Sequence, residues 1–560
     1  MTSTEEYKTL AANACARRDA SMADIEKYFP LPEGFESKHL APLPDPLPLN
    51  VTGIAKEYLN PFDYEITSAD PIKLLADIAS KKYTAVQVAA AYLRCAVLAQ
   101  RTVNCVTEFL PDMALALATK CDKYLEETGK TLGPMHGLPV SLKDMICLKG
   151  YPQGFSTCAL TTFITDYDSL IVTNLRDAGA VFYQRTTQPQ SLMHLECESV
   201  VFGRTVNPYN RNLTSGGSSG GEGAALGFGS SCIGLGTDIG GSIRNPAAMN
   251  GVFGIKLTAN RLPVGDTFFI NGGSEAIAGA VGPMGRTIEI CELLTKVVCD
   301  AEPWKISREL AAAPWNSDIL KDKKKLTIGV NYTDGVVTPQ PPVQRALKEA
   351  VEKLKAVSSI DGIEIEVVDY APFKQELGWE VITSLYFEDG AEVELETFAK
   401  VGEPVLPLTE WIIKKANPNV KHLTIPELWE RNKSKYKYRY DYNQHFLKSG
   451  VDVILAPAYF GSAQPWSTAE SLNSTWWGYT SIFNVTDMPA CTFGVTTVDP
   501  EKDKPIEGYT PLNETDKSIY ERYKPEIYKD APVALQIAAP RSEDELAFYA
   551  TKLISKFLKA

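Results

Sequence analysis

The sequence lacks any long apolar stretch. No run approaches the roughly 18 consecutive apolar residues that suggest a transmembrane helix, and residues 1–19 contain no apolar signal core. We therefore expect no membrane span and no export signal, and a cytoplasmic location. The 11 cysteines are an odd number without a CxxC pair, which is typical of reduced, buried thiols and not of a disulfide framework.

Metal-binding and nucleotide-binding motifs are also missing. Only five histidines occur, without the HxxxH or HExxH spacing of zinc enzymes, and there is neither a Walker motif nor a dinucleotide fingerprint. We expect no metal and no cofactor. The net charge of −13 argues against a nucleic-acid partner, which needs a basic face. We interpret the basic run at 433–440 as a solvated helix face with its tyrosines packed inward.

The composition is that of an ordinary globular protein, 44% hydrophobic and 22% charged over 560 residues. From residue 66 onward, segments with helical periodicity alternate with short buried-strand patterns. A helix is expected from Thr84 onward, for example, and buried strands are expected within 136–146 and at 451–458. This alternation predicts an α/β layer structure.

Residues 1–66 have a different character. A helical stretch at about 4–28 is followed by proline-rich runs between 31 and 50, which are expected to be extended and to lie on a surface. The sequence therefore predicts an N-terminal arm (1–66) beside one main domain (67–560).

The most informative stretch is 215–246, in which many glycines are mixed with core residues such as Ile233 and Leu235. A flexible linker would not carry these apolar residues, or the charged pair Asp238 and Arg244. Dense glycine among core residues indicates backbone packed close to another group, and N–H groups packed in this way form anion-binding concavities. Because serines lie within this backbone, the stretch has the outline of a nucleophile beside an oxyanion hole.

Three blocks carry a family resemblance: GLPVSLKD (137–144), GGSSGGEGA (216–224) and GTDIGGSIR (236–244). In sequence and spacing they resemble the motifs of the amidase signature family. The resemblance extends over about residues 70 to 557 and favours the fungal acetamidase and general amidase branch. It implies an α/β fold with a large mixed, twisted sheet of about ten strands, flanked by helices on both faces, with a helical N-terminal arm packed outside.

The resemblance also implies a catalytic triad. Ser242 would be the nucleophile and Lys143 the base. Ser218, which would follow a cis Gly217–Ser218 peptide bond, would pass the proton between them. A lysine can act as a base only if its pKa is lowered, and burial can lower it by several units. The apolar neighbours of Lys143 make that burial plausible.

Supporting roles follow from the same comparison. The backbone N–H groups of Ile239, Gly240, Gly241 and Ser242 are expected to form the oxyanion hole. Leu192, through its carbonyl, and Ser218 are expected to contact the substrate. Structural support is expected from the Asp238–Arg244 ion pair, Ser219 and Thr237, while Arg244 could instead bind an anionic substrate.

Two other nucleophiles compete with Ser242. The GGSSG sequence fits a GxSxG nucleophile elbow centred on Ser218, but that motif needs a preceding strand and a later histidine, and only His422 and His445 follow it. Cys147, close to Lys143, would suggest a thiol-dependent amidase. Its apolar neighbours favour a buried thiol instead.

The predicted function is hydrolysis of a small or medium carboxamide to a carboxylic acid and ammonia or an amine. Two alternatives share the motifs: the amidase subunit of a tRNA-dependent amidotransferase, and a fatty-acid-amide-type hydrolase. The acyl specificity stays open, because aromatic residues between 375 and 480 could line the pocket or belong to the core. Whether the chain forms a homodimer also stays open.

Overall fold

The computed structural model describes residues 5–31, 38–265, 267, 270–318, 321, 323–418 and 420–559. Its framework is a sheet of twelve strands in the order β1-β3-β2-β6-β8-β7-β13-β14-β12-β9-β11-β10. In that order the strands are β1 (Val106–Phe109), β3 (Val181–Thr186), β2 (Pro139–Lys143), β6 (Ile233–Asp238), β8 (Ala280–Gly285), β7 (Phe253–Lys256), β13 (Ala490–Thr497), β14 (Pro532–Ala538), β12 (Val453–Pro457), β9 (Lys325–Val330), β11 (Ile363–Asp369) and β10 (Ser359–Ile360). A separate hairpin pairs β4 (Glu198–Ser199) with β5 (Gly203–Arg204).

The sheet is mixed, as predicted. Strand β2 pairs in parallel with β3 and β6, whereas β6 and β8 are antiparallel. Strands β2, β3, β6, β8 and β14 are buried along their whole length, which fits the largely apolar sequences of β8 and β14. About ten strands were predicted and the sheet has twelve. Strand β10 has only two residues, too few for a sequence pattern to indicate a strand.

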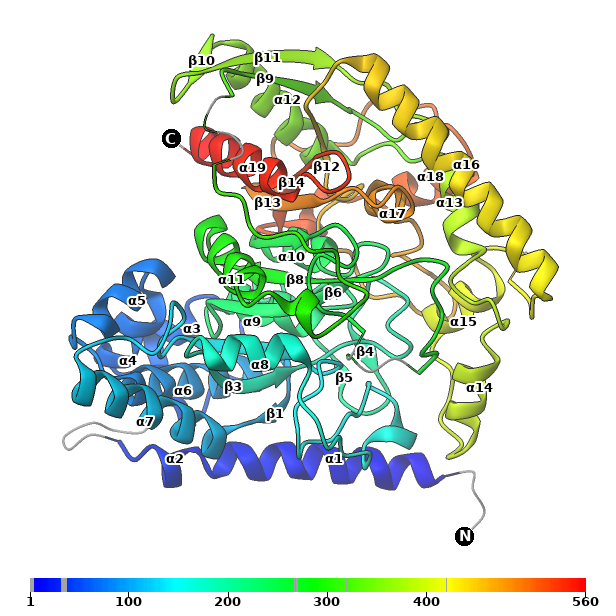
Figure 1. Cartoon of the computed structure of the whole chain (residues 1–560). Helices are drawn as coiled ribbons and strands as arrows, with labels where there is room; N and C mark the ends of the chain where they lie inside the picture. The colour runs from blue at the N-terminus through cyan, green and yellow to red at the C-terminus, as the bar shows by residue number, and fades with distance from the viewer. Residues whose placement is uncertain are drawn as a thin grey trace.

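Helices cover both faces of the sheet (Figure 1). The first half of the chain holds α1 (Glu6–Ala23), α2 (Ile25–Tyr28), α3 (Ile54–Tyr58), α4 (Pro61–Ser68), α5 (Pro71–Ala79), α6 (Ala85–Val103), α7 (Pro111–Thr128), α8 (Leu170–Asp177), α9 (Gly220–Phe228) and α10 (Arg244–Asn250). The second half holds α11 (Ile288–Asp300), α12 (Pro341–Lys355), α13 (Gln375–Thr383), α14 (Glu392–Ala399), α15 (Pro407–Lys414), α16 (Ile425–Ser449), α17 (Gly478–Val485), α18 (Glu514–Glu521) and α19 (Asp544–Lys559). Short 3-10 turns lie at Lys38–Leu40, Cys158–Leu160, Pro303–Lys305 and Pro525–Tyr528.

Local sequence signals set several helix starts. Helix α6 begins after Thr84, whose side chain forms a reciprocal capping box with Gln87. The Asp70 carboxylate caps α5 by accepting from two backbone N–H groups. Helix α4 was not predicted, although Asn60 caps it and Pro61 occupies its first position.

The N-terminal region is helical, and α1 runs along the outside of the sheet beside β1 (Figure 1). The Tyr7 N–H donates to the Val401 carbonyl, and Ala14 packs in a small apolar cluster with Phe202. The proline-rich stretch from 41 to 50 contains neither helix nor strand, while residues 32–37 of the earlier run lie outside the described residues.

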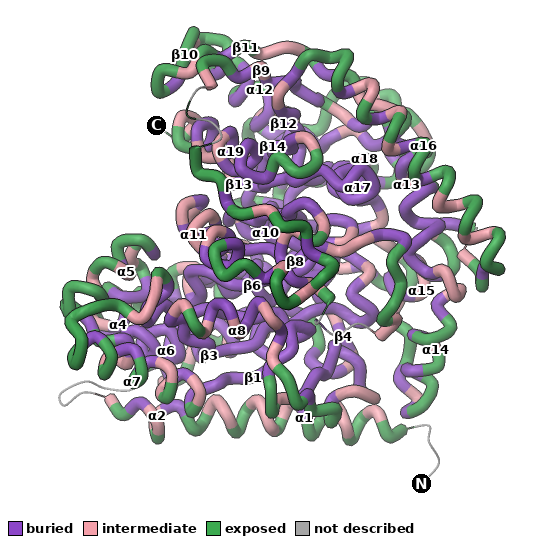
Figure 2. The backbone as a smooth tube through the Cα atoms, viewed as in Figure 1, coloured by how far each residue is buried: buried purple, intermediate pink, exposed green. Residues whose placement is uncertain are grey.

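The buried residues are concentrated along the sheet and in the helices that pack on it (Figure 2). None of the 11 cysteines, all of which are described, forms a disulfide, and ten are buried. The basic run 433–440 lies on α16, but only part of its interpretation holds: Tyr438 is buried, whereas Tyr436 and Tyr440 are exposed. One helix face cannot bury residues at both i and i+2.

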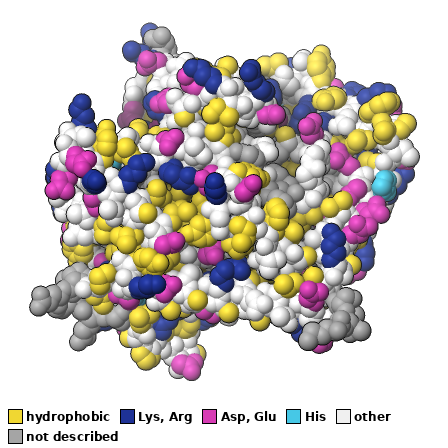
Figure 3. Space-filling view, turned by 60° about the horizontal axis from the view of Figure 1, so that its bottom comes forward, with side chains coloured by type: hydrophobic (Ala, Val, Ile, Leu, Met, Phe, Trp, Pro, Cys, Tyr) yellow, Lys and Arg dark blue, Asp and Glu magenta, His cyan; other side chains and the backbone are white. Residues whose placement is uncertain are grey.

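The surface carries charges of both signs. Basic and acidic side chains alternate, with hydrophobic ones between them, on the face drawn in Figure 3. Within the described part of the chain, no helix is long and apolar enough to span a membrane.

Candidate active site

Lys143 and Ser218 meet in the interior. Lys143 ends β2 and is fully buried, and its Nζ lies 2.7 Å from Ser218 Oγ and 2.8 Å from Thr237 Oγ1. The Thr237 hydroxyl donates in turn to Met145 Sδ, 3.0 Å away, so Thr237 accepts a hydrogen bond from the lysine. A neutral amine has two N–H groups and one lone pair. Lys143 Nζ donates to both hydroxyl oxygens here, and the lone pair of the neutral amine can accept a proton from the Ser218 hydroxyl.

The two glycine-rich segments are joined by their backbones. The Ser219 N–H donates to the Ser242 carbonyl at 3.0 Å, and the Gly217–Ser218 peptide is cis. Ser219 Oγ also contacts the backbone N–H and carbonyl of Thr237 at 3.3 and 3.4 Å. Ser218 and Ser242 are both buried. The structure therefore brings Lys143, Ser218 and the Ser242 loop together.

The Ser242 loop connects β6 to α10, and its two glycines are required by space. A Cβ on Gly240 would lie 2.5 Å from Tyr386 Oη. Gly241 has φ +132°, and a Cβ there would lie 2.2 Å from Thr480 Oγ1. Larger residues at either position would push the loop away from its neighbours.

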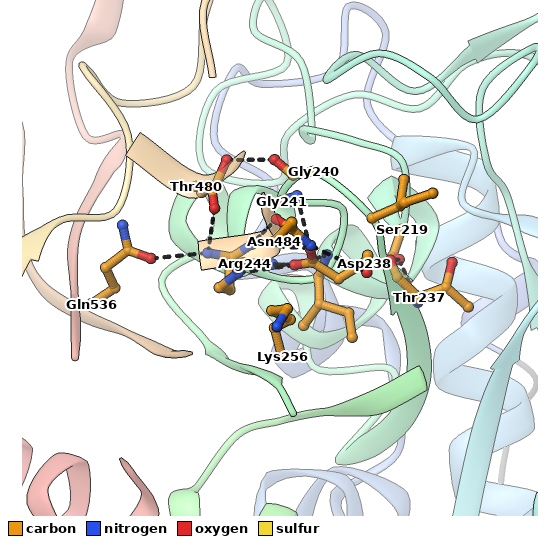
Figure 4. A network of polar contacts seen from close by, with 12 residues as sticks. Ser219, Thr237, Asp238, Gly240, Gly241, Arg244, Lys256, Thr480, Asn484 and Gln536 are labelled. Carbon is orange, nitrogen blue, oxygen red and sulfur yellow. Dashed lines mark hydrogen bonds and ion pairs between the residues drawn. The ribbon is translucent and has the colours of Figure 1, made fainter. Parts of the chain in front are cut away.

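An ion pair anchors this loop. Arg244 Nε lies 3.0 Å from Asp238 Oδ2, and Arg244 Nη2 lies 3.0 Å from Oδ1, with both residues fully buried (Figure 4). Asn484 Nδ2 also donates to Asp238 Oδ1, at 2.8 Å. Burial alone would raise the pKa of Asp238, but the Arg244 charge and these hydrogen bonds outweigh it and lower that pKa to about 2. Asp238 is therefore a fixed anion.

Arg244 is fully engaged by protein acceptors. Besides Asp238, its guanidinium donates to the Thr480 carbonyl at 2.9 Å, to Gln536 Oε1 at 3.3 Å and to Asn484 Oδ1 at 2.6 Å (Figure 4). These contacts account for all five of its N–H donors. The arrangement favours the structural role over binding of an anionic substrate.

The backbone donors around Ser242 do not all face the same way. The Gly241 N–H donates to Asp238 Oδ1 at 2.8 Å. Ile239, Gly240 and Ser242 line a small cavity, and Gly241 does not. The Gly241 N–H, which was expected to donate to the oxyanion, instead donates to the carboxylate that anchors the loop. The sequence could not reveal this, because it depends on where the Asp238 carboxylate lies.

The cavity beside Ser242 has a volume of about 10 Å³. Its other walls are residues 192–195, Tyr386 and Trp477. Ser191 and Leu192 both have φ near +61°, a conformation that costs a non-glycine residue about 1–3 kcal/mol. Leu192, predicted to contact the substrate, thus lines the cavity in a backbone conformation that the surrounding structure must impose.

Burial controls the charge of Lys143. It lowers the pKa of this lysine to about 7, although the nearby Cys197, Asp238 and Glu222 act in the opposite direction. Glu222, whose role the sequence did not suggest, accepts from Ser141 Oγ at 2.6 Å and from Thr186 Oγ1 at 2.9 Å. Burial raises the pKa of Glu222 to about 7.

The competing nucleophiles lie elsewhere or lack their context. Cys147 is buried, contacts Tyr167 Oη through its thiol and does not line the cavity. No strand leads directly into Ser218, because the described residues 205–217, between β5 and Ser218, contain none. His422 and His445 do not line the cavity either, whereas His194 does. Burial lowers the pKa of His194 to about 4, so its ring is neutral near pH 7.

Among the described residues, no group of three His, Cys, Asp or Glu side chains could hold a metal ion.

Several site residues come from distant segments that the sequence analysis did not assign. Thr480 and Asn484 lie on α17, and Tyr386 follows α13. Thr480 Oγ1 donates to the Gly240 carbonyl at 2.7 Å, and Tyr386 Oη to the Ile239 carbonyl at 3.3 Å. The aromatic stretch 375–480 was the available signal. Tyr386, Phe387 and Trp477 all belong to one buried apolar cluster, and of these Tyr386 and Trp477 also line the cavity.

Known proteins share the sequence and the fold. The family model described as Amidase matches residues 87–548. A Schizosaccharomyces pombe protein that carries an amidase name is 42% identical over 97% of both chains. The acetamidase of Emericella nidulans is 35% identical over 89% of this chain and 91% of that one. Among solved structures, a fatty acid amide hydrolase superposes with a TM-score of 0.89 at 31% identity, covering 100% of this chain and 98% of that one.

Proposed function

The chain belongs to the amidase signature family and is a hydrolase acting on amide bonds, and from that premise we propose that Ser242, Ser218 and Lys143 carry out the hydrolysis. The observation that supports this most directly is the 2.7 Å contact between buried Lys143 Nζ and Ser218 Oγ, on a segment hydrogen-bonded to Ser242. Neither contact follows from the fold alone.

In the proposed first half-reaction, Ser242 Oγ attacks the amide carbonyl carbon. Its proton passes to Ser218 Oγ while the Ser218 proton passes to neutral Lys143. The backbone N–H groups of Ile239, Gly240 and Ser242 stabilise the oxyanion, and one such donor contributes about 3 kcal/mol in comparable sites. Lys143 then returns a proton through Ser218 to the leaving nitrogen, and the C–N bond breaks to give an acyl-enzyme.

In the second half-reaction, water attacks the ester bond of the acyl-enzyme. The same relay takes a proton from the water and returns one to Ser242 Oγ, releasing the carboxylic acid. The relay needs neutral Lys143 at the start of each half-reaction. A base with a pKa near the working pH serves this best, and burial supplies that pKa for Lys143.

We propose a small or medium primary carboxamide as substrate. Two curated relatives are named acetamidases, while the solved neighbour is named a fatty acid amide hydrolase. The cavity of about 10 Å³ beside Ser242 favours a small acyl group. The purified chain alone should release ammonia from such amides without ATP or a partner, and a strict requirement for either would favour an amidotransferase subunit.

Activity is expected to survive metal chelation. No group of described side chains could hold a catalytic ion, and the proposed steps use only serine, lysine and backbone groups. Turnover after prolonged treatment with EDTA should stay within about twofold of the untreated enzyme. A fluorophosphonate should modify Ser242, as located by mass spectrometry of the labelled peptide. Loss of turnover that zinc restores, or a label on Cys147, would contradict this prediction.

Glu222→Gln is expected to move the acidic limb of the pH profile to lower pH. The Glu222 carboxylate, when ionised, stabilises protonated Lys143, together with Cys197 and Asp238. The amide removes that stabilisation, so the pKa of Lys143 falls and the neutral base persists to lower pH. The shift should be at most about 0.5 pH unit, because the pKa of Glu222 is itself about 7 and its carboxylate is only partly ionised across this limb.

The control for this shift is Glu196→Gln. Glu196 is also a buried glutamate, but it accepts hydrogen bonds from the Ser467 hydroxyl and N–H, at 2.6 and 2.9 Å. It is not among the groups that act on Lys143. The measurement is kcat/KM against pH for the parent and both variants. A limb that moves upward in Glu222→Gln, or equally in both variants, would contradict the assignment.

A further inference from the structure

The cavity beside Ser242 has almost no room for an acyl group. Its volume of about 10 Å³ is about what a single water molecule needs. An acyl group bonded to Ser242 Oγ that grows within this space must either displace a side chain that lines it or extend through the cavity's open side. The lining side chains that cannot move easily therefore limit the acyl chain on the closed side.

Two rings line this cavity together with Leu192. Tyr386 is 4% exposed, and its hydroxyl donates to the Ile239 carbonyl at 3.3 Å. Trp477 is 2% exposed. A Cβ added to Gly240 would lie 2.5 Å from Tyr386 Oη and 3.2 Å from Trp477 Nε1. Both rings therefore pack directly on the loop that carries Ser242.

A layer of tryptophans holds the Trp477 ring in place, and the hydrogen bond to the Ile239 carbonyl fixes Tyr386. Trp477 packs edge-on against Trp379 and Trp411, with ring centroids 4.9 and 5.5 Å apart. Trp379 also contacts Trp476 at 4.7 Å, and Trp476 Nε1 donates to Asp334 Oδ2 at 2.7 Å. Displacing Trp477 would disturb several buried ring contacts, each contributing about 0.5–1.5 kcal/mol beyond its buried area.

We propose that Tyr386 and Trp477, the aromatic wall, restrict the acyl group of the substrate to a short chain. The substrates are then primary amides of small aliphatic acids. This inference rests on the proposed function, because it assumes that the acyl group is bonded to Ser242. In an apolar pocket one methylene changes specificity by about 10–200-fold, so a rigid wall should produce a sharp cut-off.

The test is a homologous series of unbranched primary amides, from acetamide to octanamide, assayed by ammonia release. In the parent enzyme, kcat/KM should fall at least tenfold for each methylene beyond the cut-off. Tyr386→Ala removes the ring and should raise the ratio of kcat/KM for hexanamide to that for acetamide at least tenfold. Trp477→Leu is a second variant that should change the ratio in the same direction if Tyr386→Ala does not fold.

Two controls separate ring volume from other effects. Tyr386→Phe keeps the ring and loses only the hydroxyl, so the hexanamide to acetamide ratio should stay within about threefold of the parent's. Trp429→Ala removes an exposed tryptophan from α16 and should leave both activities unchanged. A change in the ratio of similar size in either control would overturn the steric explanation.

The possible results show separately whether the aromatic wall is wrong and whether the proposed amide hydrolysis is wrong. If the parent hydrolyses hexanamide as efficiently as acetamide, or if folded wall variants leave the ratio within twofold, the aromatic wall is wrong while amide hydrolysis stands. If the parent hydrolyses no member of the series and a fluorophosphonate does not label Ser242, the proposed function fails as well. The labelling rate with short and long alkyl fluorophosphonates gives the same comparison without turnover.

Discussion

Replacing Ser242 by alanine is expected to reduce kcat by about a millionfold, the loss typical of removing a serine nucleophile. Without Oγ no acyl-enzyme can form, and the remaining donors only bind the substrate. The fold should persist, because the contact from the Ser219 N–H goes to the Ser242 backbone carbonyl, which alanine retains. Steady-state ammonia release and thermal unfolding measure the two effects separately.

The matched control is Ser68→Ala, at an exposed position that ends α4. It should keep full turnover and the parent's melting temperature. If Ser242→Ala retained activity within tenfold of the parent, the nucleophile would lie elsewhere. Ser218 and then Cys147 would be the next positions to replace.

The parts of the site that could be predicted from the sequence are those encoded locally. The three residues of the proposed triad lie in short motifs, and β2 could be predicted because its apolar run is buried on both faces. The start of α6 follows from the Thr84 capping box, which spans only four residues. Each of these signals is complete within about ten residues of chain.

What the sequence could not give depends on contacts between distant segments. Tyr386 lies 147 residues from Ile239, whose carbonyl it contacts, and Asn484 lies 246 residues from Asp238. The aromatic stretch marked a candidate region, but only packing decides which rings line the cavity. The Gly241 N–H could be assigned to the ion pair and not to the oxyanion only once the Asp238 carboxylate was located.

The proton relay also depends on contacts that no motif specifies. Thr237 donates to Met145 Sδ and so accepts from Lys143 Nζ, which also donates to Ser218 Oγ. These two contacts hold the amine beside the hydroxyl from which it would take a proton. Glu222 accepts hydrogen bonds from Ser141 and Thr186. Ser141 lies two positions before Lys143 on β2, and Thr186 is the residue paired with Lys143 on β3. These two contacts place Glu222 close to Lys143. The strand register, more than the motif, thus sets the electrostatics of the base.

Lys143→Met is expected to reduce kcat by at least a thousandfold and to remove the acidic limb of the pH profile. In the parent, kcat/KM should rise with pH through the pKa of Lys143, about 7, because only the neutral amine can accept a proton. Below that pH activity should fall about tenfold per unit. Methionine is close in volume and cannot accept the proton, so both the rate and the limb depend on the amine.

Stability separates this loss from misfolding. At pH 7 an unfolded lysine is protonated, whereas burial favours the neutral amine in the folded state, so burying Lys143 opposes folding below its ordinary pKa. The methionine variant should therefore melt no lower than the parent. Lys256→Met is the control, since Lys256 is also buried but donates to the Met488 carbonyl, 3.0 Å away. Whatever stability it loses, it should keep the acidic limb.

Lys143→Arg should not restore the limb, because a guanidinium keeps its proton throughout this range. The midpoint of the limb also discriminates between bases. His194 lines the cavity and could also act as a base, and its pKa of about 4 would place a midpoint three units lower than that of Lys143. A parent midpoint near 4, or an arginine variant with the parent's profile, would assign the base to another group and overturn the Ser-Ser-Lys relay.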